Sequence, residues 1–190
     1  MKQLLLAVIM PAAAFGADYT IDTTHSSVQF SVRHMMVSNV RGEFAKVTGA
    51  VSYDPNDIAA TKIEATIDAA TINTREPKRD AHLKSADFFD VAKFPTMTFQ
   101  SAKASRGACG GLTVTGNLTL HGVTKEVAFK VDGPTPEIKD QRGGARMGAT
   151  ATARINRKDF GLTWNRALEA GGVVVGEDVD ITIDVELIRK

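Results

Sequence analysis

The histidines are the residues best suited to acid–base or metal chemistry, because imidazole titrates near neutral pH and binds metal ions readily. There are four of them: His25, His34, His82 and His121. Their spacing matches no metal signature such as His-Glu-x-x-His. The chain also has no Gly-x-Ser-x-Gly elbow, phosphate-binding loop or dinucleotide motif. The pattern therefore predicts no catalytic residue, no metal ion and no cofactor.

The single cysteine, Cys109, excludes an internal disulfide and any zinc site built on several thiolates. It lies in the run Gly-Ala-Cys-Gly-Gly, which is typical of a turn. Three interpretations stay open: a free thiol, a cysteine that pairs between chains, and a turn residue without a role.

Length and composition are those of a folded domain. The chain has 190 residues, of which 43% are hydrophobic, so it can bury one sizeable core. There are 23 basic and 22 acidic residues, which gives a formal net charge of +1. Because nucleic-acid binding needs an excess of positive charge, we expect no nucleic-acid partner.

The first 17 residues have the layout of a secretory signal peptide. Lys2 supplies one positive charge, an apolar run covers residues 4–10, and small residues offer a cleavage site after Gly16 or after Ala17. The apolar run is too short to span a bilayer. The alternative is a buried first strand or helix. With the signal peptide removed, residues 18–190 carry 22 basic and 22 acidic residues, and we expect a periplasmic domain that is not embedded in a membrane.

Alternation of apolar and polar residues dominates the remaining chain and predicts strands with one apolar face. The clearest segments are residues 27–33, 62–68, 112–120, 127–132 and 179–187, and weaker ones are residues 42–53, 96–103 and 146–155. Eight such strands bury their apolar faces in a closed barrel or in a two-sheet sandwich. The strands are long, which favours an elongated barrel. Between residues 75 and 94 the alternation stops, and Pro77 predicts a short helical insertion.

The segment around residues 147–155 has small residues on both faces. Ala149, Ala151 and Ala153 alternate with glycine and threonine. In a barrel wall, small residues either leave room for a ligand or allow the strand to coil strongly. The pattern alone does not choose between the two.

Four segments together resemble the YceI family of exported lipid-binding proteins. They are DTTHSSVQFSVRH with VRGEF (residues 22–34 and 40–44), HLKSADFFDV with FPTMTF (82–91 and 94–99), GNLTLHGVTK (116–125), and INRKDFGL with VDI (155–162 and 179–181). Their order along nearly the whole predicted mature chain makes the resemblance specific. The run Trp164-Asn165-Arg166 departs from the pattern, which puts the role of that loop in doubt.

The resemblance implies an all-β fold, an elongated eight-stranded antiparallel barrel similar to lipocalins with a short helical insertion near residues 75–94. It also implies a long apolar cavity that holds a long-chain isoprenoid, such as a polyprenyl compound or a quinone tail, or another amphiphilic lipid. Family members often form homodimers, so a homodimer is expected.

A lipid tail needs only apolar surroundings, because each methylene removed from water contributes roughly 0.8 kcal/mol. The residues that we expect to line the cavity are large and apolar, and they belong to predicted strands or to the irregular segments. They are Phe30, Val32, Phe44, Ile67, Phe88, Phe89, Met97, Phe99, Leu118, Leu120, Phe129, Phe160 and Trp164. Phe88 and Phe89, in the insertion, are candidates for a plug or lid. For each residue, ordinary core packing is the alternative.

Polar groups are needed only at the mouth, where they fix a head group. We expect Arg33, His34, Arg75 and Arg157 there, because a cation pairs with a phosphate or donates a hydrogen bond to a quinone oxygen. The alternative for each is solvated surface charge.

Three functions follow. The first is a periplasmic carrier or sequestering protein for an isoprenoid-type lipid, without enzymatic activity. The second is an enzyme that acts on a bound lipid or quinone, with His25, His34 or His121 as acid or base. The third is a stress-response interaction module with a solid interior.

Overall fold

The computed structural model describes residues 17–107, 110–169 and 171–190. The leader expected in residues 1–17 lies outside these residues except for Ala17, and Cys109 lies outside them as well. Within the described ranges there are twelve strands. Their bounds are β1 Ala17–Ile21, β2 Ser27–His34, β3 Ser38–Phe44, β4 Val47–Tyr53, β5 Lys62–Asp68, β6 Ile72–Asn73, β7 Thr96–Arg106, β8 Leu112–Leu120, β9 Val123–Asp132, β10 Ile138–Lys139, β11 Ala145–Asn156 and β12 Val175–Arg189.

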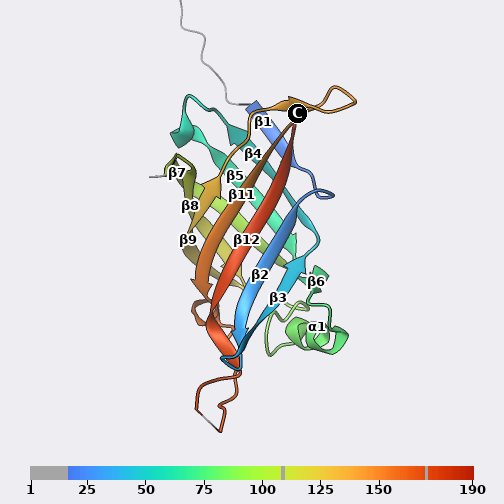
Figure 1. Ribbon diagram of the computed structural model, residues 1–190, viewed down its shortest axis with the longest axis vertical. Coiled ribbons are helices and arrows are strands. Elements are labelled where there is room, and N and C mark those ends of the chain that lie inside the picture. Colours follow the sequence, from blue (N-terminus) through green and yellow to red (C-terminus); the bar gives the residue numbers. More distant parts are fainter. Residues whose placement is uncertain (1–16, 108–109, 170) are drawn as a thin grey trace, which may run out of the picture.

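The strands close into a barrel of eight positions, all antiparallel (Figure 1). β1 and β2 share one position, β3 and β4 share the next, and β5 and β6 the third. β7, β8, β9, β11 and β12 complete the ring. β12 closes it, because it pairs with β11 along one edge and with β2 and then β1 along the other. The predicted eight-stranded barrel is therefore confirmed, and the sandwich alternative is wrong.

Two strand predictions need correction. The single strand expected over residues 42–53 is the end of β3 followed by β4, with a break at residues 45 and 46. This break lets β3 pair with β6 while β4 pairs with β5. β1, at the boundary of the expected leader, was not predicted as a strand, yet Ala17 is paired with Tyr53.

The alternating sequence explains the wall of the barrel. In β8, Leu112, Val114, Gly116, Leu118 and Leu120 are buried, whereas the residues between them are half-buried or exposed. Gly42 in β3 has a specific reason to lack a side chain. A Cβ atom at this position would lie 2.5 Å from the ring of Phe30, which pairs with it across the β2–β3 ladder.

The insertion lies at one end of the barrel, called the lower end here as in Figure 1. It contains helix α1, Pro77–Lys84, and a series of turns that leads to β7. Pro77 stands in the first turn, and the Glu76 carboxylate caps the helix by accepting hydrogen bonds from the N–H groups of Lys78 (3.2 Å) and Arg79 (2.6 Å). The helical insertion predicted near residues 75–94 is thus confirmed.

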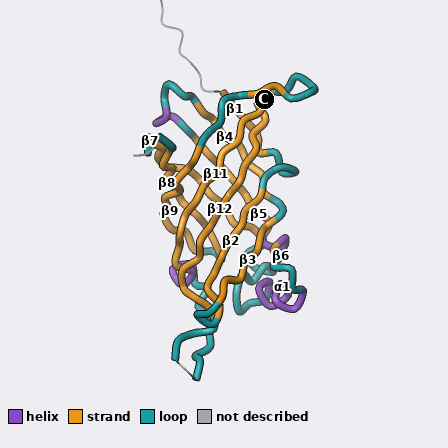
Figure 2. The backbone as a smooth tube through the Cα atoms, in the orientation of Figure 1, coloured by secondary structure: helices purple, strands orange, loops and turns teal. Residues whose placement is uncertain are grey.

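The tube in Figure 2 shows that nearly all regular structure is in the barrel wall. Besides α1 there are three short 3-10 turns, Ile58–Ala60, Ala69–Thr71 and Arg157–Phe160, among the described residues. At the upper end lie β1, the short β10 and the C-terminus. In the described part of the chain, no helix has the length and apolar character needed to cross a membrane.

Candidate functional site

The interior of the barrel contains two apolar cavities, one above the other along the barrel axis. The lower cavity has a volume of about 130 Å³ and the upper one about 140 Å³. They share five wall residues: Val28, Ile67, Leu118, Phe129 and Ile183. A ligand chain that fills both cavities must therefore pass these shared side chains.

Strand β12 contributes several side chains to both cavities. Val175, Val179 and Ile181 face the lower cavity, Ile183 faces both, and Val185 and Leu187 face the upper one. These residues have odd numbers because alternate side chains of a strand point to the same face. From Val179 to Leu187 the inward face of β12 is an unbroken apolar track that passes both cavities, whereas a β-bulge with the exposed Glu177 separates this track from Val175.

Eleven of the thirteen residues predicted to line a cavity do so. In the lower cavity these are Phe30, Val32, Phe44, Ile67, Phe88, Phe89, Met97, Leu118, Leu120 and Phe129. Phe99 lines the upper cavity, which Ile67, Leu118 and Phe129 also reach. Whether these side chains contact a ligand stays a prediction.

Phe160 and Trp164 are absent from both walls. Phe160 is 2% exposed and is packed in the main core cluster, where the 3-10 turn after β11 buries it. Trp164 lies farther out, with its ring 5.0 Å from that of His82 and 5.1 Å from that of Phe88. The prediction for Trp164 was wrong because this residue lies in an irregular loop, and strand alternation does not predict the direction of a loop side chain.

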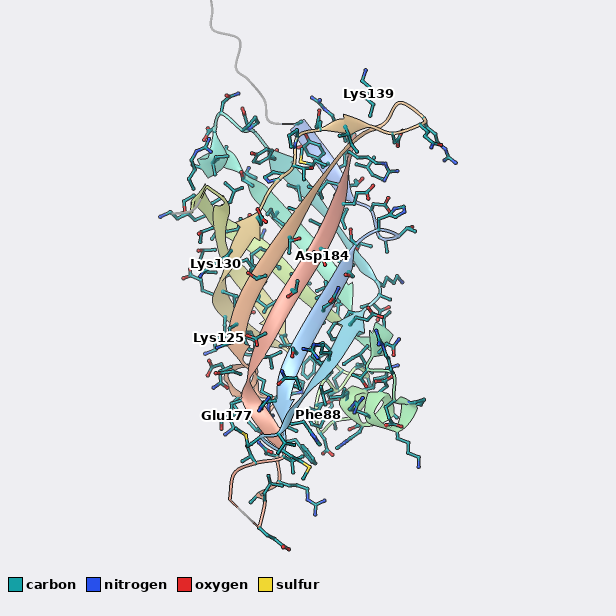
Figure 3. The ribbon with its side chains drawn as sticks, in the orientation of Figure 1. Phe88, Lys125, Lys130, Lys139, Glu177 and Asp184 are labelled. Atoms are coloured by element: carbon teal, nitrogen blue, oxygen red, sulfur yellow. The ribbon has the colours of Figure 1, made fainter. Side chains whose placement is uncertain are left out.

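The insertion closes the lower cavity with aromatic rings. Phe89 packs edge-on against Phe44 with ring centroids 5.6 Å apart. Phe88 lies between the cavity and a layer formed by His82 and Trp164. Figure 3 places Phe88 at the lower end of the barrel. This position agrees with the prediction that Phe88 and Phe89 form a plug.

Arg157 is the one head-group candidate in a cavity wall. It is buried, and its guanidinium donates hydrogen bonds to the carbonyl oxygens of Leu162, Val175 (3.3 Å) and Gly176 (2.8 Å). Burial lowers the pKa of this guanidinium from its usual value. No carboxylate of the described residues pairs with it. The positive charge of Arg157 is stabilised by the dipoles of these three carbonyl groups, and the same hydrogen bonds hold the loop after β11 in place.

The other three head-group candidates lie outside the cavities. Arg33 and Arg75 are exposed, and His34 is half-buried at the end of β2. The Arg33 guanidinium donates to the Met36 carbonyl oxygen (3.0 Å) and to Asn39 Oδ1 (3.4 Å). Arg75 has a left-handed backbone with φ at 64°. These positions are at the lower end, but the structure does not direct them into the cavity.

Beside the upper cavity lies a polar contact that the sequence did not indicate. Tyr53, Pro134 and Met147 line both the upper cavity and an outer cleft of about 580 Å³. In this cleft the Tyr19 hydroxyl donates a 2.6 Å hydrogen bond to Glu137, and Arg189 pairs with Glu137 at 3.1 Å. Burial and the neighbouring carboxylate raise the pKa of Tyr19 to about 12. We call Tyr19, Glu137 and Arg189 the upper latch.

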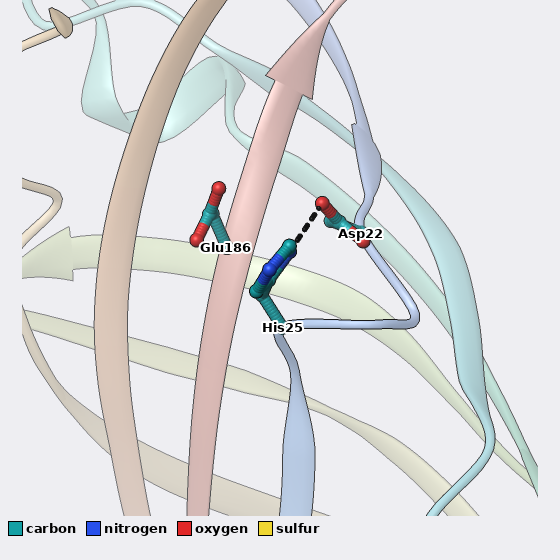
Figure 4. Close-up of side chains that lie close together, drawn as sticks. All are labelled: Asp22, His25 and Glu186. Carbon is teal, nitrogen blue, oxygen red and sulfur yellow. Dashed lines mark hydrogen bonds and ion pairs between the residues drawn. The ribbon is translucent and has the colours of Figure 1, made fainter. Parts of the chain in front are cut away.

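A second polar cluster lies on the outer surface, where β1 passes into β2. His25 Nδ1 lies 2.9 Å from the Asp22 carboxylate, and Glu186 is beside them (Figure 4). The three side chains place donor atoms within 4.8 Å of one another, as a metal site would. However, the Arg146 guanidinium pairs with both Asp22 (2.7 Å) and Glu186 (2.5 Å), so a cation already balances these carboxylates.

The histidines are not part of the interior. None of the four is among the residues that line either cavity in the described structure. His25 is on the outer surface with Asp22, and the ring of His121 packs against Phe94 at 4.8 Å. His82 pairs with Asp87 at 2.8 Å. The arrangement supplies an apolar container, and it does not place an imidazole against a molecule held inside.

A closed eight-stranded antiparallel barrel has an interior that side chains fill or that holds one small ligand, and the apolar walls of this barrel leave two cavities. The chain belongs to the YceI-like domain family, whose sequence model matches residues 19–187.

A UPF0312 protein of Staphylococcus aureus strain N315 is 38% identical over 169 residues, which cover 89% of this chain and 96% of the relative. Two solved structures have the same fold. BcnA of Burkholderia cenocepacia has a TM-score of 0.74 at 23% identity, over 87% of this chain and 98% of BcnA. A polyisoprenoid binding domain from Saccharophagus degradans has a TM-score of 0.65 at 17% identity, over 90% of this chain and 98% of that domain.

Proposed function

We propose that this protein binds a long-chain amphiphile, a polyisoprenoid or a quinone-type lipid, inside its barrel. As an exported protein it would carry or sequester this lipid in the periplasm. The observation that carries the proposal is the inward face of β12, which extends the apolar wall through both cavities. The domain from Saccharophagus degradans, which shares the fold, is described as polyisoprenoid binding, and this supports the choice of ligand class.

The affinity of such a site comes from burial of the tail. Each methylene transferred from water contributes roughly 0.8 kcal/mol, so the apolar walls need no hydrogen bond to the chain. A branched isoprenoid tail suits a lower cavity lined by the rings of Phe30, Phe44 and Phe129. The upper cavity has smaller wall residues, Ala65, Ala149 and Ala151, and accepts the far end of the tail.

Binding without catalysis accounts best for the placement of the polar groups. The histidines that an enzyme would use as acid or base lie outside both cavity walls. Arg157, which does reach the lower cavity, is held by three carbonyl oxygens and orients the wall around the ligand. Two cavities inside the barrel also argue against a module with a solid core.

Native purification followed by organic extraction and mass spectrometry tests the proposal. The expected result is an apolar, isoprenoid-type compound in a stoichiometric amount. Native mass spectrometry of the same sample also reports whether the chain forms the homodimer expected from the family. Protein that carries no extractable compound and takes up no polyprenol or long-chain quinone in solution would overturn the proposal.

A blocked cavity sharpens this test. Ala151→Trp places a large ring in the upper cavity, whereas Thr152→Trp places the same ring on the exposed outer face of β11. Overpacking costs roughly 1–3 kcal/mol of folding stability, so the barrel is expected to survive it. We expect Ala151→Trp to lose the longest polyprenols of a chain-length series and to keep the shortest. Thr152→Trp is expected to bind the whole series like the unmodified protein.

A further inference from the structure

The exposed apolar side chains of this protein are concentrated on one turn. In the described residues, four large hydrophobic side chains are exposed, and three of them are consecutive in the turn between β2 and β3. They are Met35 (45% exposed), Met36 (52%) and Val37 (77%), here called the apolar tip. The fourth is Ile138 in β10, and Figure 3 places its neighbour Lys139 at the opposite end of the barrel.

The backbone of the apolar tip does not favour these residues. The turn is closed by a 3.0 Å hydrogen bond from the Val37 N–H to the His34 carbonyl oxygen. Its two central residues, Met35 and Met36, are both left-handed, with φ at 49° and 62°. Turns with two such residues prefer Asn-Gly, because a side chain with a larger Cβ branch is strained there. Two methionines at these positions are therefore unfavourable for the fold, although their side chains are exposed.

The apolar tip lies at the end of the barrel that holds the lower cavity. Val32, three residues before Met35, lines that cavity, and so does Val175, which pairs with His34 across the β2–β12 ladder. The Met35 N–H donates a 2.7 Å hydrogen bond to the Val174 carbonyl oxygen, which fixes the turn against the segment that leads into β12. Figure 3 shows Glu177, near the start of β12, at this same end.

Charges of both signs lie near the apolar tip: two arginines on the hairpin, and Glu177 and Asp178 in the β12 bulge beside it. Arg33 and Arg41 are exposed and lie on the face opposite to the inward residues Val32 and Phe30. In the described chain neither arginine pairs with a carboxylate. Exposed cations beside an apolar protrusion are typical of segments that sit at an anionic membrane surface.

We infer that the apolar tip inserts into the surface of a lipid bilayer, where the lower end of the barrel exchanges its ligand with the membrane. The inference rests on the proposed function, because a bilayer is the natural source of a long-chain amphiphile. A bilayer fits better than a protein partner. Three consecutive side chains on one turn form a small patch, whereas a stable protein interface takes roughly 800 Å² from each partner.

The double variant Met35→Asn with Met36→Gly tests the inference without endangering the fold, because Asn-Gly is the sequence that this turn prefers. Co-sedimentation uses vesicles of phosphatidylcholine with phosphatidylglycerol, and vesicles of phosphatidylcholine alone. We expect the unmodified protein to bind the mixed vesicles more strongly, and the double variant to bind them about tenfold more weakly. Ile138→Asn removes an exposed apolar side chain at the opposite end and is expected to leave vesicle binding unchanged.

A second measurement separates this inference from the proposed function. Transfer of a polyprenol from vesicles is expected to be slower for the double variant, while its affinity for polyprenol presented in detergent is unchanged. Equal vesicle binding by the unmodified protein and the double variant would overturn the membrane contact. So would a dimer that dissociates in the double variant without any vesicle binding, since the tip would then bind a second copy. Failure to bind polyprenol in detergent would instead overturn the proposed function.

Discussion

The two ends of the barrel are closed in different ways. At the lower end, the insertion covers the cavity with Phe88 and Phe89, and the rings of Phe44 and Trp164 pack against them at 5.6 Å and 5.1 Å. At the upper end, Tyr53, Pro134 and Met147 separate the cavity from an outer cleft, and this cleft contains the hydrogen bond from Tyr19 to Glu137 and the ion pair between Glu137 and Arg189. The contacts of the lower closure are apolar, whereas the upper end also has a polar contact.

This difference indicates which end opens for a ligand. Apolar contacts have no fixed direction, so aromatic side chains of the insertion can repack around a lipid tail and still be buried. A hydrogen bond has a defined geometry and is lost once its partners separate. If the protein binds a lipid as proposed, we expect an uncharged tail to enter at the lower end, where it replaces one apolar contact with another. We expect the upper latch to keep the far end of the barrel shut.

The largest loss of folding stability is expected from a substitution in the apolar core at the lower end. Phe160→Ala removes a ring that is 2% exposed and should lower the free energy of unfolding by roughly 3–5 kcal/mol, as large-to-small core substitutions do. Urea unfolding measures this loss. Because Phe160 lines neither cavity, the variant that remains folded should still bind ligand.

Trp164→Ala is the matched control for Phe160→Ala, because Trp164 is also aromatic and outside the cavity walls but only half-buried. Its loss of stability should be clearly smaller. If both variants lost the same free energy of unfolding, the depth of burial of an aromatic ring would not determine how much it stabilises the lower end.

A smaller loss of folding stability is expected from a substitution in the upper latch. Tyr19→Phe removes one hydrogen bond to a carboxylate, which is worth roughly 1.5–3 kcal/mol. Urea unfolding at neutral pH measures it. Tyr53→Phe is the control, since Tyr53 lines the same cleft as Tyr19 but is not part of the latch.

The latch should also respond to alkali in a defined direction. The pKa of Tyr19 is raised from 10.0 to about 12 in the folded protein, so the folded state favours the protonated phenol. The stability that this provides is complete below pH 10 and is lost as the pH rises through about 12. Ultraviolet absorption of tyrosinate should show a late titration that Tyr19→Phe abolishes and Tyr53→Phe leaves in place. A Tyr19 that ionises near pH 10 would mean that the latch is open in solution.

Much of the barrel was predictable because each strand carries its own pattern. Val32 and Phe30 share a face in any strand, so their common direction into the cavity follows from alternation. The break between β3 and β4 was missed because residues 45 and 46 are alanine and lysine, which carry no turn signal. β1 was missed because its five residues adjoin the predicted leader.

The polar contacts around the cavities were harder to predict from the sequence than the strands. Tyr19 and Glu137 are 118 positions apart, and no local pattern links them. Arg157 was expected at the mouth, but its partners are backbone carbonyl oxygens, which every residue has and no sequence motif marks. Side-chain direction in loops, as at Trp164, depends on packing that alternation does not describe.

The smallest loss of stability is expected at the surface cluster of Asp22, His25 and Glu186, where β1 passes into β2. The Asp22 carboxylate raises the pKa of His25 above 6.5, and His25 and Arg146 lower the pKa of Asp22. The stabilisation from charged His25 is therefore complete below pH 6.5 and is lost as the pH rises through its raised value. His25 is 59% exposed, so solvent screens the pair and high salt weakens it further. NMR titration should show a raised His25 pKa that falls in concentrated salt and in Asp22→Asn. If His25→Gln lowered the free energy of unfolding as much as Tyr19→Phe does, this exposed cluster would stabilise the fold as strongly as the upper latch. The expected order of the two effects would then be wrong.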